Sequence, residues 1–112
     1  MKELTREAFP EFIHSNELVI IHFWAKWDRY DEQMKNLLKL EIRSERALAV
    51  ATIDTGIEEN WPICQELGIR NLPSLAFYRS GSLVKLITGL GVAGVRAAIE
   101  ELEAPLRAPG CL

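Results

Sequence analysis

Two aspartates, Asp28 and Asp31, follow directly after the most apolar stretch of the chain, in the segment Trp27-Asp28-Arg29-Tyr30-Asp31. Residues three or four apart share a helix face, so a helix that begins here carries both carboxylates on one side. An aspartate at a helix start accepts hydrogen bonds from main-chain N–H groups that have no partner within the helix. Such a cap stabilises a helix by about 0.5–2 kcal/mol relative to alanine. We therefore interpret both aspartates as structural caps.

The same pair, with His22 on the preceding apolar segment, is also a candidate for acid–base chemistry or cation binding. Two carboxylates alone make a weak site, because Mg²⁺ and Ca²⁺ take more oxygen ligands than this segment offers. His22 stands in the middle of an apolar run, where a histidine is more often a neutral core residue. We expect no catalytic residue, no bound metal and no cofactor here, and keep the carboxylate site as an alternative.

Thiol chemistry is the second option. The chain has two cysteines, Cys64 and Cys111, which are far apart and form no motif. Cys64 stands beside Ile63 and Leu67 and is expected to be a small buried apolar residue. Cys111, near the last residue, is expected to be exposed and free. A thiol-dependent activity through either cysteine, in mixed disulfides or with glutathione, is the alternative enzymatic function.

Apolar spacing predicts the elements that position these residues. Continuous apolar runs indicate buried strands, and apolar residues at helical spacing indicate helices packed on them. The first helix starts at Thr5, or near Phe9 because Pro10 interrupts the pattern. The predicted strands are 18–25, 48–54, 75–78 and 83–88, and the later helices are about 28–44, 60–68 and 92–102.

Length and composition limit the function. A chain of 112 residues with net charge −3 suits one domain, predicted over residues 1–103, and a flexible tail over 104–112. The charge gives no reason to expect nucleic acid or an acidic membrane as partner. The apolar run Leu18–Ala25 is too short to span a bilayer. The first residues form no apolar signal, so we expect a cytoplasmic protein.

The segment Val19-Ile20-Ile21-His22-Phe23-Trp24-Ala25-Lys26-Trp27 resembles the strand and turn that deliver the reactive cysteine pair in thioredoxins. Other landmarks fall in the same register between about Leu4 and Leu102: Ile53-Asp54, Gly68-Ile69-Arg70-Asn71-Leu72-Pro73-Ser74, Ser80-Gly81 and Gly89. The resemblance implies a thioredoxin fold, an α/β arrangement with a central mixed sheet of four to five strands flanked by helices on both faces. It also implies a cis peptide bond before Pro73.

The departures from that family concern its chemistry. Asp28 and Asp31 stand at the two cysteine positions, with Arg29-Tyr30 between them. His22 replaces the usual buried acid, and Val50 the usual lysine. A thiolate attacks a disulfide and a carboxylate does not, so a conventional disulfide reductase is not expected. The segment is also similar to the N-terminal domain of multidomain monothiol glutaredoxins, which is regarded as a docking module.

The resemblance further implies a shallow apolar groove formed by Trp27, Leu72, Pro73, Gly89 and Leu90. An extended partner segment would pair with main chain near Leu72. Arg29 and Tyr30 would enlarge that surface. The function predicted from the sequence is thus a redox-inactive adaptor, regulatory partner or co-chaperone that binds a protein or peptide through this groove.

Overall fold

The computed structural model describes residues 2–27, 31–41, 48–88 and 92–107. Its centre is a five-stranded sheet with the strand order β1-β3-β2-β4-β5. The strands are β1 (Lys2–Glu3), β2 (Leu18–Trp24), β3 (Leu48–Asp54), β4 (Ser74–Arg79) and β5 (Ser82–Thr88). The helices are α1 (Phe9–Ser15), α2 (Asp31–Glu41), a 3-10 turn η1 (Glu58–Asn60), α3 (Trp61–Leu67) and α4 (Val92–Arg107).

The sheet is mixed, as predicted. Strands β1, β3 and β2 run parallel, and β4 and β5 are antiparallel to their neighbours. Strand β2 lies at the centre and is buried along Leu18–Phe23, which is the outcome that its continuous apolar run predicted. Strand β1 was not predicted, because two residues are too short to show a periodicity.

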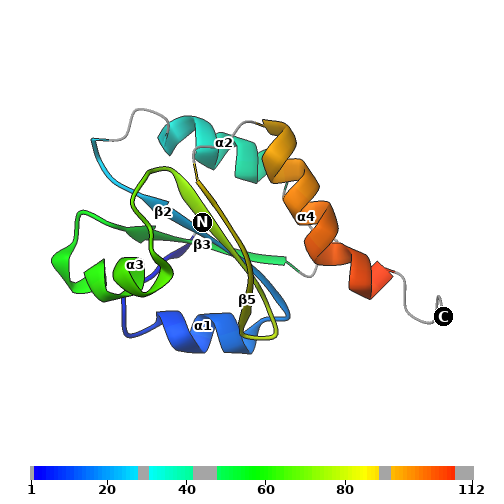
Figure 1. The fold of residues 1–112 in the computed structure, drawn as a ribbon, viewed down its shortest axis with the longest axis horizontal. Coiled ribbons are helices and arrows are strands. Elements are labelled where there is room, and N and C mark those ends of the chain that lie inside the picture. Colours follow the sequence, from blue (N-terminus) through cyan, green and yellow to red (C-terminus); the bar gives the residue numbers. More distant parts are fainter. Residues whose placement is uncertain (1, 28–30, 42–47, 89–91, 108–112) are drawn as a thin grey trace.

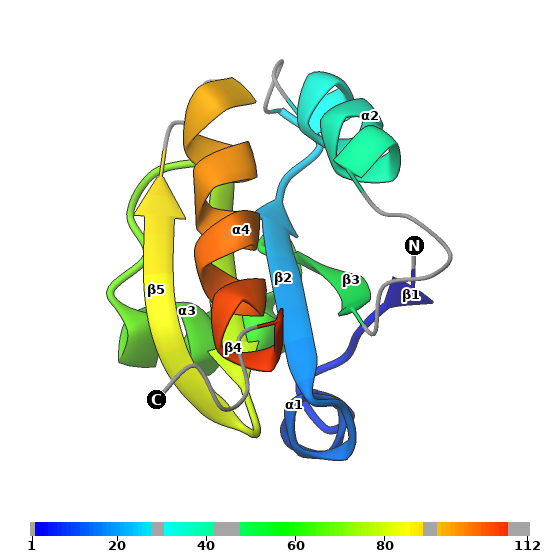
Figure 2. The same cartoon turned by 90° about the vertical axis from the view of Figure 1, so that its right-hand side faces the viewer.

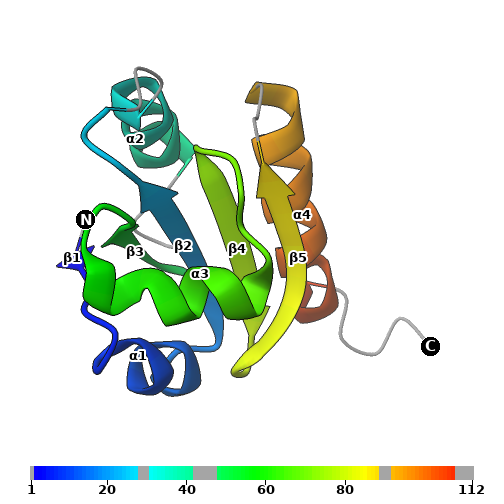
Figure 3. The ribbon, with the colours of Figure 1, turned by 60° about the vertical axis from the view of Figure 1, so that its left-hand side comes forward.

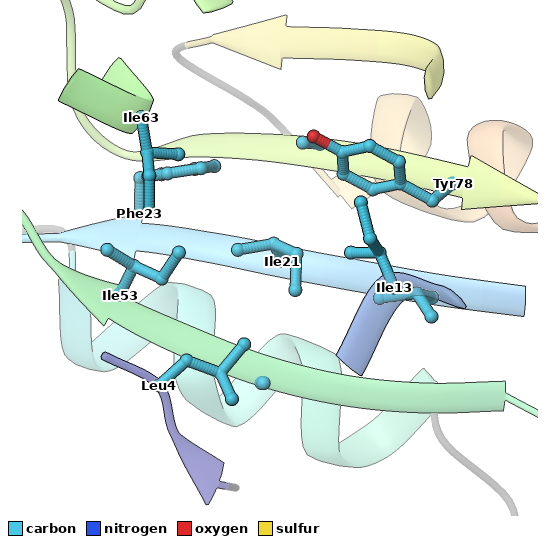
Figure 4. Packing of buried hydrophobic residues seen from close by; sticks show 10 residues of the cluster. Leu4, Ile13, Ile21, Phe23, Ile53, Ile63 and Tyr78 are labelled. Carbon is cyan, nitrogen blue, oxygen red and sulfur yellow. The ribbon is translucent and has the colours of Figure 1, made fainter. Parts of the chain in front are cut away.

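Helices cover both faces of the sheet. Figures 1 and 3 show α1 and α3 on one face and α2 and α4 on the other. Alternate residues of β2 face the two layers, so that Ile21 joins one core cluster and Ile20 the other. The cluster beneath α1 and α3 is drawn in Figure 4 and contains Leu4, Ile13, Ile21, Phe23, Ile53, Ile63 and Tyr78.

One helix boundary agrees with an expected alternative and another differs from the sequence prediction. Helix α1 begins at Phe9, the later of the two expected starts, and Pro10 takes a first-turn position where its missing N–H has no helical partner to lose. Helix α4 continues past Leu102 through Pro105 to Arg107. The first part of the predicted tail is therefore helical, and residues 108–112 lie outside the described residues.

None of the described helices is long and apolar enough to cross a membrane.

Candidate functional site

The segments that carry the predicted site residues converge at one end of the sheet. The register pairs Phe23 at the end of β2 with Ser74 at the start of β4, and Ser74 with Thr88 at the end of β5. Trp24 is likewise level with Asp54, the last residue of β3. In Figure 2 the tips of β2 and β5 point to the end where α2 lies. Topology thus gathers the expected groove segments at this edge.

The structure describes part of the predicted groove. The Leu72–Pro73 peptide bond is cis, as the resemblance implied. Leu72 is half-buried and Pro73 is buried, whereas the Trp27 side chain is 73% exposed. Ser74 fixes the loop from the other side, because its hydroxyl donates a hydrogen bond to the Asn71 carbonyl oxygen. Their role as a groove stays a prediction.

The remaining site predictions fall largely outside the described residues. These are Asp28, Arg29, Tyr30, Gly89, Leu90 and Cys111. Asp31 is the first residue of α2 as described. The prediction that the two aspartates cap this helix therefore stays a prediction.

His22 is fully buried on the α2 side of β2, between Thr52 on β3 and Leu75 on β4. Burial, with a smaller effect from the nearby positive charge of Lys35, lowers the pKa of His22 from 6.5 to about 4. The imidazole is therefore neutral at pH 7. This agrees with the expectation of a neutral core histidine.

Trp24 closes this end of the sheet next to His22. The Lys35 ammonium lies 4.2 Å from the centre of the Trp24 ring, within the range of a cation–π interaction. On the opposite side the indole nitrogen donates a long, 3.4 Å hydrogen bond to Glu3 Oε2. Trp24 thus packs between α2 and β1 at the sheet end.

The loop after β3 supports Trp27. Asp54 Oδ1 accepts a 2.8 Å hydrogen bond from the Gly56 N–H, which turns the chain directly after the strand. A Cβ placed on Gly56 would stand 3.3 Å from Trp27 Cζ3, so the Trp27 ring lies over this glycine. Glycine at this position therefore lets the loop approach the ring closely.

Two exposed apolar residues near this site were missed from the sequence. Ile57 and Trp61 are 44% and 49% exposed, and Trp61 was interpreted only as a helix start. Its indole N–H donates a 3.0 Å hydrogen bond to the Thr55 carbonyl oxygen, on the same loop that supports Trp27. No signal in the sequence marked either residue as exposed, because their exposure depends on how the loop packs.

Cys64 lies on α3, one helical turn after Trp61, and is half-buried against the cluster beneath α1 and α3. Burial raises the pKa of its thiol, and a backbone hydrogen bond opposes that shift. At neutral pH the thiol is consequently less ionised than an exposed cysteine.

No metal centre is formed within the described ranges, where no group of three His, Cys, Asp or Glu side chains is arranged to hold an ion. A hollow of about 270 Å³ between the β4–β5 hairpin and α4 is lined by Phe77, Arg79, Val84, Lys85, Ala98, Glu101 and Leu102. It lies away from the predicted site residues.

Comparison with known proteins defines the fold and then the family. Mitochondrial thioredoxin 3 from Saccharomyces cerevisiae, in its oxidised form, superposes with a TM-score of 0.81 at 22% identity, over 90% of this chain and 94% of the other. The oxidised thioredoxin from Plasmodium falciparum gives 0.78 at 22% identity, over 90% and 96%. The predicted thioredoxin fold is confirmed.

Sequence comparison goes further than the fold. The profile of the family described as Thioredoxin matches residues 1–101. The chain is 29% identical to a thioredoxin from Listeria monocytogenes over 89 residues, which cover 80% of this chain and 84% of that protein. It is 24% identical to a thioredoxin from Malassezia sympodialis over 95 residues, covering 85% and 90%. The chain belongs to the thioredoxin family.

These relatives contradict the prediction of a redox-inactive adaptor, regulatory partner or co-chaperone. The matching proteins are named thioredoxins, which are redox proteins, and none of those reported indicates an adaptor. The error arose because the absence of cysteine at positions 28 and 31 was given more weight than the family resemblance, so that a thiol-dependent redox function was kept only as the alternative. That absence excludes a dithiol at these positions and leaves chemistry through one thiol open.

Proposed function

We propose that this chain takes part in thiol–disulfide exchange, the chemistry of its relatives, and that it does so with one cysteine and an external thiol. The observation that carries this is the family match over residues 1–101 in a sequence without cysteine at positions 28 and 31. Because the usual pair of attacking and resolving thiols is missing from that motif, a single thiol must serve.

The exchange cycle has two balanced steps. The protein thiolate attacks a mixed disulfide, forms a protein–S–S–R bond and releases the other thiolate. An external thiolate, such as that of glutathione, then attacks the R sulfur of the protein–S–S–R disulfide. This step releases the protein thiolate and leaves R in a disulfide with glutathione. Glutathione is the first thiol to test, because it is an abundant small thiol of reducing compartments. The cytoplasm, where we expect this chain, supplies such a thiol pool.

Cys64 is the thiol that we assign to this exchange. It is half-buried on α3, so one side of the helix leaves it partly accessible. Its raised pKa means that the thiolate fraction, and with it the exchange rate, increases as the pH is raised above neutrality.

Glutathione-coupled reduction of a small mixed disulfide tests the proposal. The protein is expected to give turnover above buffer, increasing from pH 7 to pH 9. The variant Cys64→Ala should lose this turnover and the matched Cys111→Ala variant should keep it. Turnover that persists in the protein carrying both Cys64→Ala and Cys111→Ala contradicts the proposal, and so does the absence of turnover in the unmodified protein. Loss in Cys111→Ala alone would contradict the assignment to Cys64.

A further inference from the structure

Three large apolar side chains are exposed around a single short loop, and the thiol exchange proposed above makes no use of them. Trp27, Ile57 and Trp61 are 73%, 44% and 49% exposed. We call them the Trp27–Ile57–Trp61 patch. Exposed apolar area gathered in one place marks interaction sites more often than apolar residues scattered singly.

One loop carries or contacts every member of the patch. The Trp27 ring lies over Gly56, next to Ile57 in the chain, since a Cβ on Gly56 would stand 3.3 Å from the ring. The Trp61 indole is bonded to the Thr55 carbonyl oxygen at 3.0 Å. All three side chains thus project from, or rest on, residues 55–61.

Hydrogen bonds hold this loop in one conformation. Asp54 Oδ1 accepts from Gly56 N at 2.8 Å, and the Ile57 N–H reaches the Asp54 carbonyl oxygen at 3.3 Å. The buried Asn60 side chain donates to the same carbonyl oxygen at 3.0 Å. The patch is therefore preorganised, which reduces the ordering entropy that binding would otherwise cost.

Acidic side chains lie next to the patch in η1. Glu58 and Glu59 are exposed in η1, immediately after Ile57. Lys26, directly before Trp27 in the chain, is also exposed. A partner is thus attracted if its basic groups lie over η1, and the exposed indoles also favour cations over their faces.

We propose that the Trp27–Ile57–Trp61 patch binds a protein segment in which aliphatic side chains alternate with lysine or arginine. The aliphatic groups pack on the two indoles and Ile57, and the basic groups pair with Glu58 and Glu59. Tryptophan is enriched among the side chains that dominate binding energies at interfaces. The two glutamates disfavour nucleic acid and acidic segments at the same place.

The test measures binding alone, in a Cys64→Ala, Cys111→Ala protein, so its result is independent of thiol exchange. The ¹⁵N-labelled protein is titrated with an acetylated, amidated Lys-Leu-Lys-Leu-Lys peptide. Three tryptophans give three indole N–H signals, assigned by substitution. The Trp27 and Trp61 signals are expected to shift, and the Trp24 signal, beneath Lys35, to stay.

Matched variants distinguish binding at the patch from non-specific binding to exposed apolar side chains. Trp61→Ala is expected to weaken binding about tenfold, as for a side chain at the centre of an interface. Leu83→Ala removes a side chain that is also 44% exposed, on β5, and should leave binding unchanged. Reversing both charges, Glu58→Lys with Glu59→Lys, or raising the salt concentration should weaken binding.

Three results would overturn the proposal. The first is an equal shift with the matching Glu-Leu-Glu-Leu-Glu peptide. The second is the absence of a shift at millimolar concentrations of the lysine peptide. In the third, the Trp27 and Trp61 signals move on dilution of the protein without peptide, which assigns the patch to a second copy of the chain.

Discussion

The Arg79 guanidinium on β4 donates a hydrogen bond to the main-chain oxygen of Leu102 in α4, with 2.8 Å between Nη2 and the oxygen. A longer contact of 3.4 Å joins the same nitrogen to the main-chain oxygen of Glu101. Pro105, four residues after Glu101, has no N–H to give to that oxygen, so Arg79 supplies the missing donor. The side chain of one strand thereby lets the helix continue through a proline to Arg107.

Removing this donor should destabilise the protein. Arg79→Met is expected to lower the free energy of unfolding by about 1–3 kcal/mol, because the part-buried Leu102 carbonyl oxygen loses the charged donor. The control Lys85→Met breaks only the exposed ion pair with Glu101, 3.1 Å long, and should cost less than about 1 kcal/mol. Urea denaturation measures both, and an equal or larger effect of Lys85→Met would contradict this account.

Two glycines with positive φ offer a matched comparison. A Cβ on Gly81, at φ +83°, would lie 2.4 Å from His14 Cδ2, whereas a Cβ on Gly68, at φ +71°, meets nothing within 4 Å. Gly68→Ala should therefore cost about 1–2 kcal/mol from the left-handed backbone alone. Gly81→Ala should cost more, because the His14 ring must also move. If thermal denaturation shows equal losses, or if adding His14→Ala does not reduce the loss for Gly81→Ala, the His14 contact is irrelevant.

His22 should make stability depend on pH in the acidic range. Its pKa is lowered to about 4 in the folded chain, against 6.5 ordinarily, so between these values the unfolded chain binds a proton that the folded chain does not. The free energy of unfolding therefore keeps its full value above pH 6.5 and decreases as the pH falls towards 4. The total decrease is about 3 kcal/mol, at 1.36 kcal/mol for each unit by which the pKa is lowered.

Urea midpoints measured between pH 4 and 7 test this dependence. His22→Asn removes the titrating group and should flatten the profile over that range. Lys35→Met removes the nearby positive charge and should raise the pKa of His22 without restoring its ordinary value, because burial has the larger effect. The same slope in His22→Asn and in the unmodified protein would count against His22 as its source.

The thioredoxin fold of this chain should accept cysteines at positions 28 and 31, where the family has its reactive pair. Asp28→Cys together with Asp31→Cys is expected to raise disulfide reduction in the insulin turbidity assay above that of the unmodified protein, since the chain matches the thioredoxin family over residues 1–101. Asp28→Ser with Asp31→Ser is the matched control. If the folded cysteine variant reduces no more insulin than the serine variant, this end of the sheet has diverged from the family.

The fold was predictable because local patterns report it directly. The unbroken apolar run of β2 predicts burial on both faces, and Ile20 and Ile21 indeed join opposite core clusters. The extension of α4 was not predictable from the same kind of pattern. Pro105 normally ends a helix, and the donor that compensates for it, Arg79, comes from a distant strand.

Two features of the site were predictable, one in the main chain and one in a side chain. The resemblance implied the cis peptide bond, and the position of His22 within a strand implied its burial. Which tryptophan stays uncovered is a property of the packed surface. The resemblance placed Trp27 at a surface groove, and Trp27 does lie exposed over Gly56. The resemblance said nothing of Trp61, whose exposure depends on how the loop before α3 packs.

Asp54 joins the sheet to an exposed surface loop. Its main chain is paired in register with Trp24, while its carboxylate and carbonyl oxygens hold the turn at Gly56 and Asn60. The side chains at positions 57 and 61 are about half exposed and belong to neither core cluster, so substitutions there change the surface more than the core. A lineage that keeps this aspartate can thus change what the loop recognises without having to find a new fold.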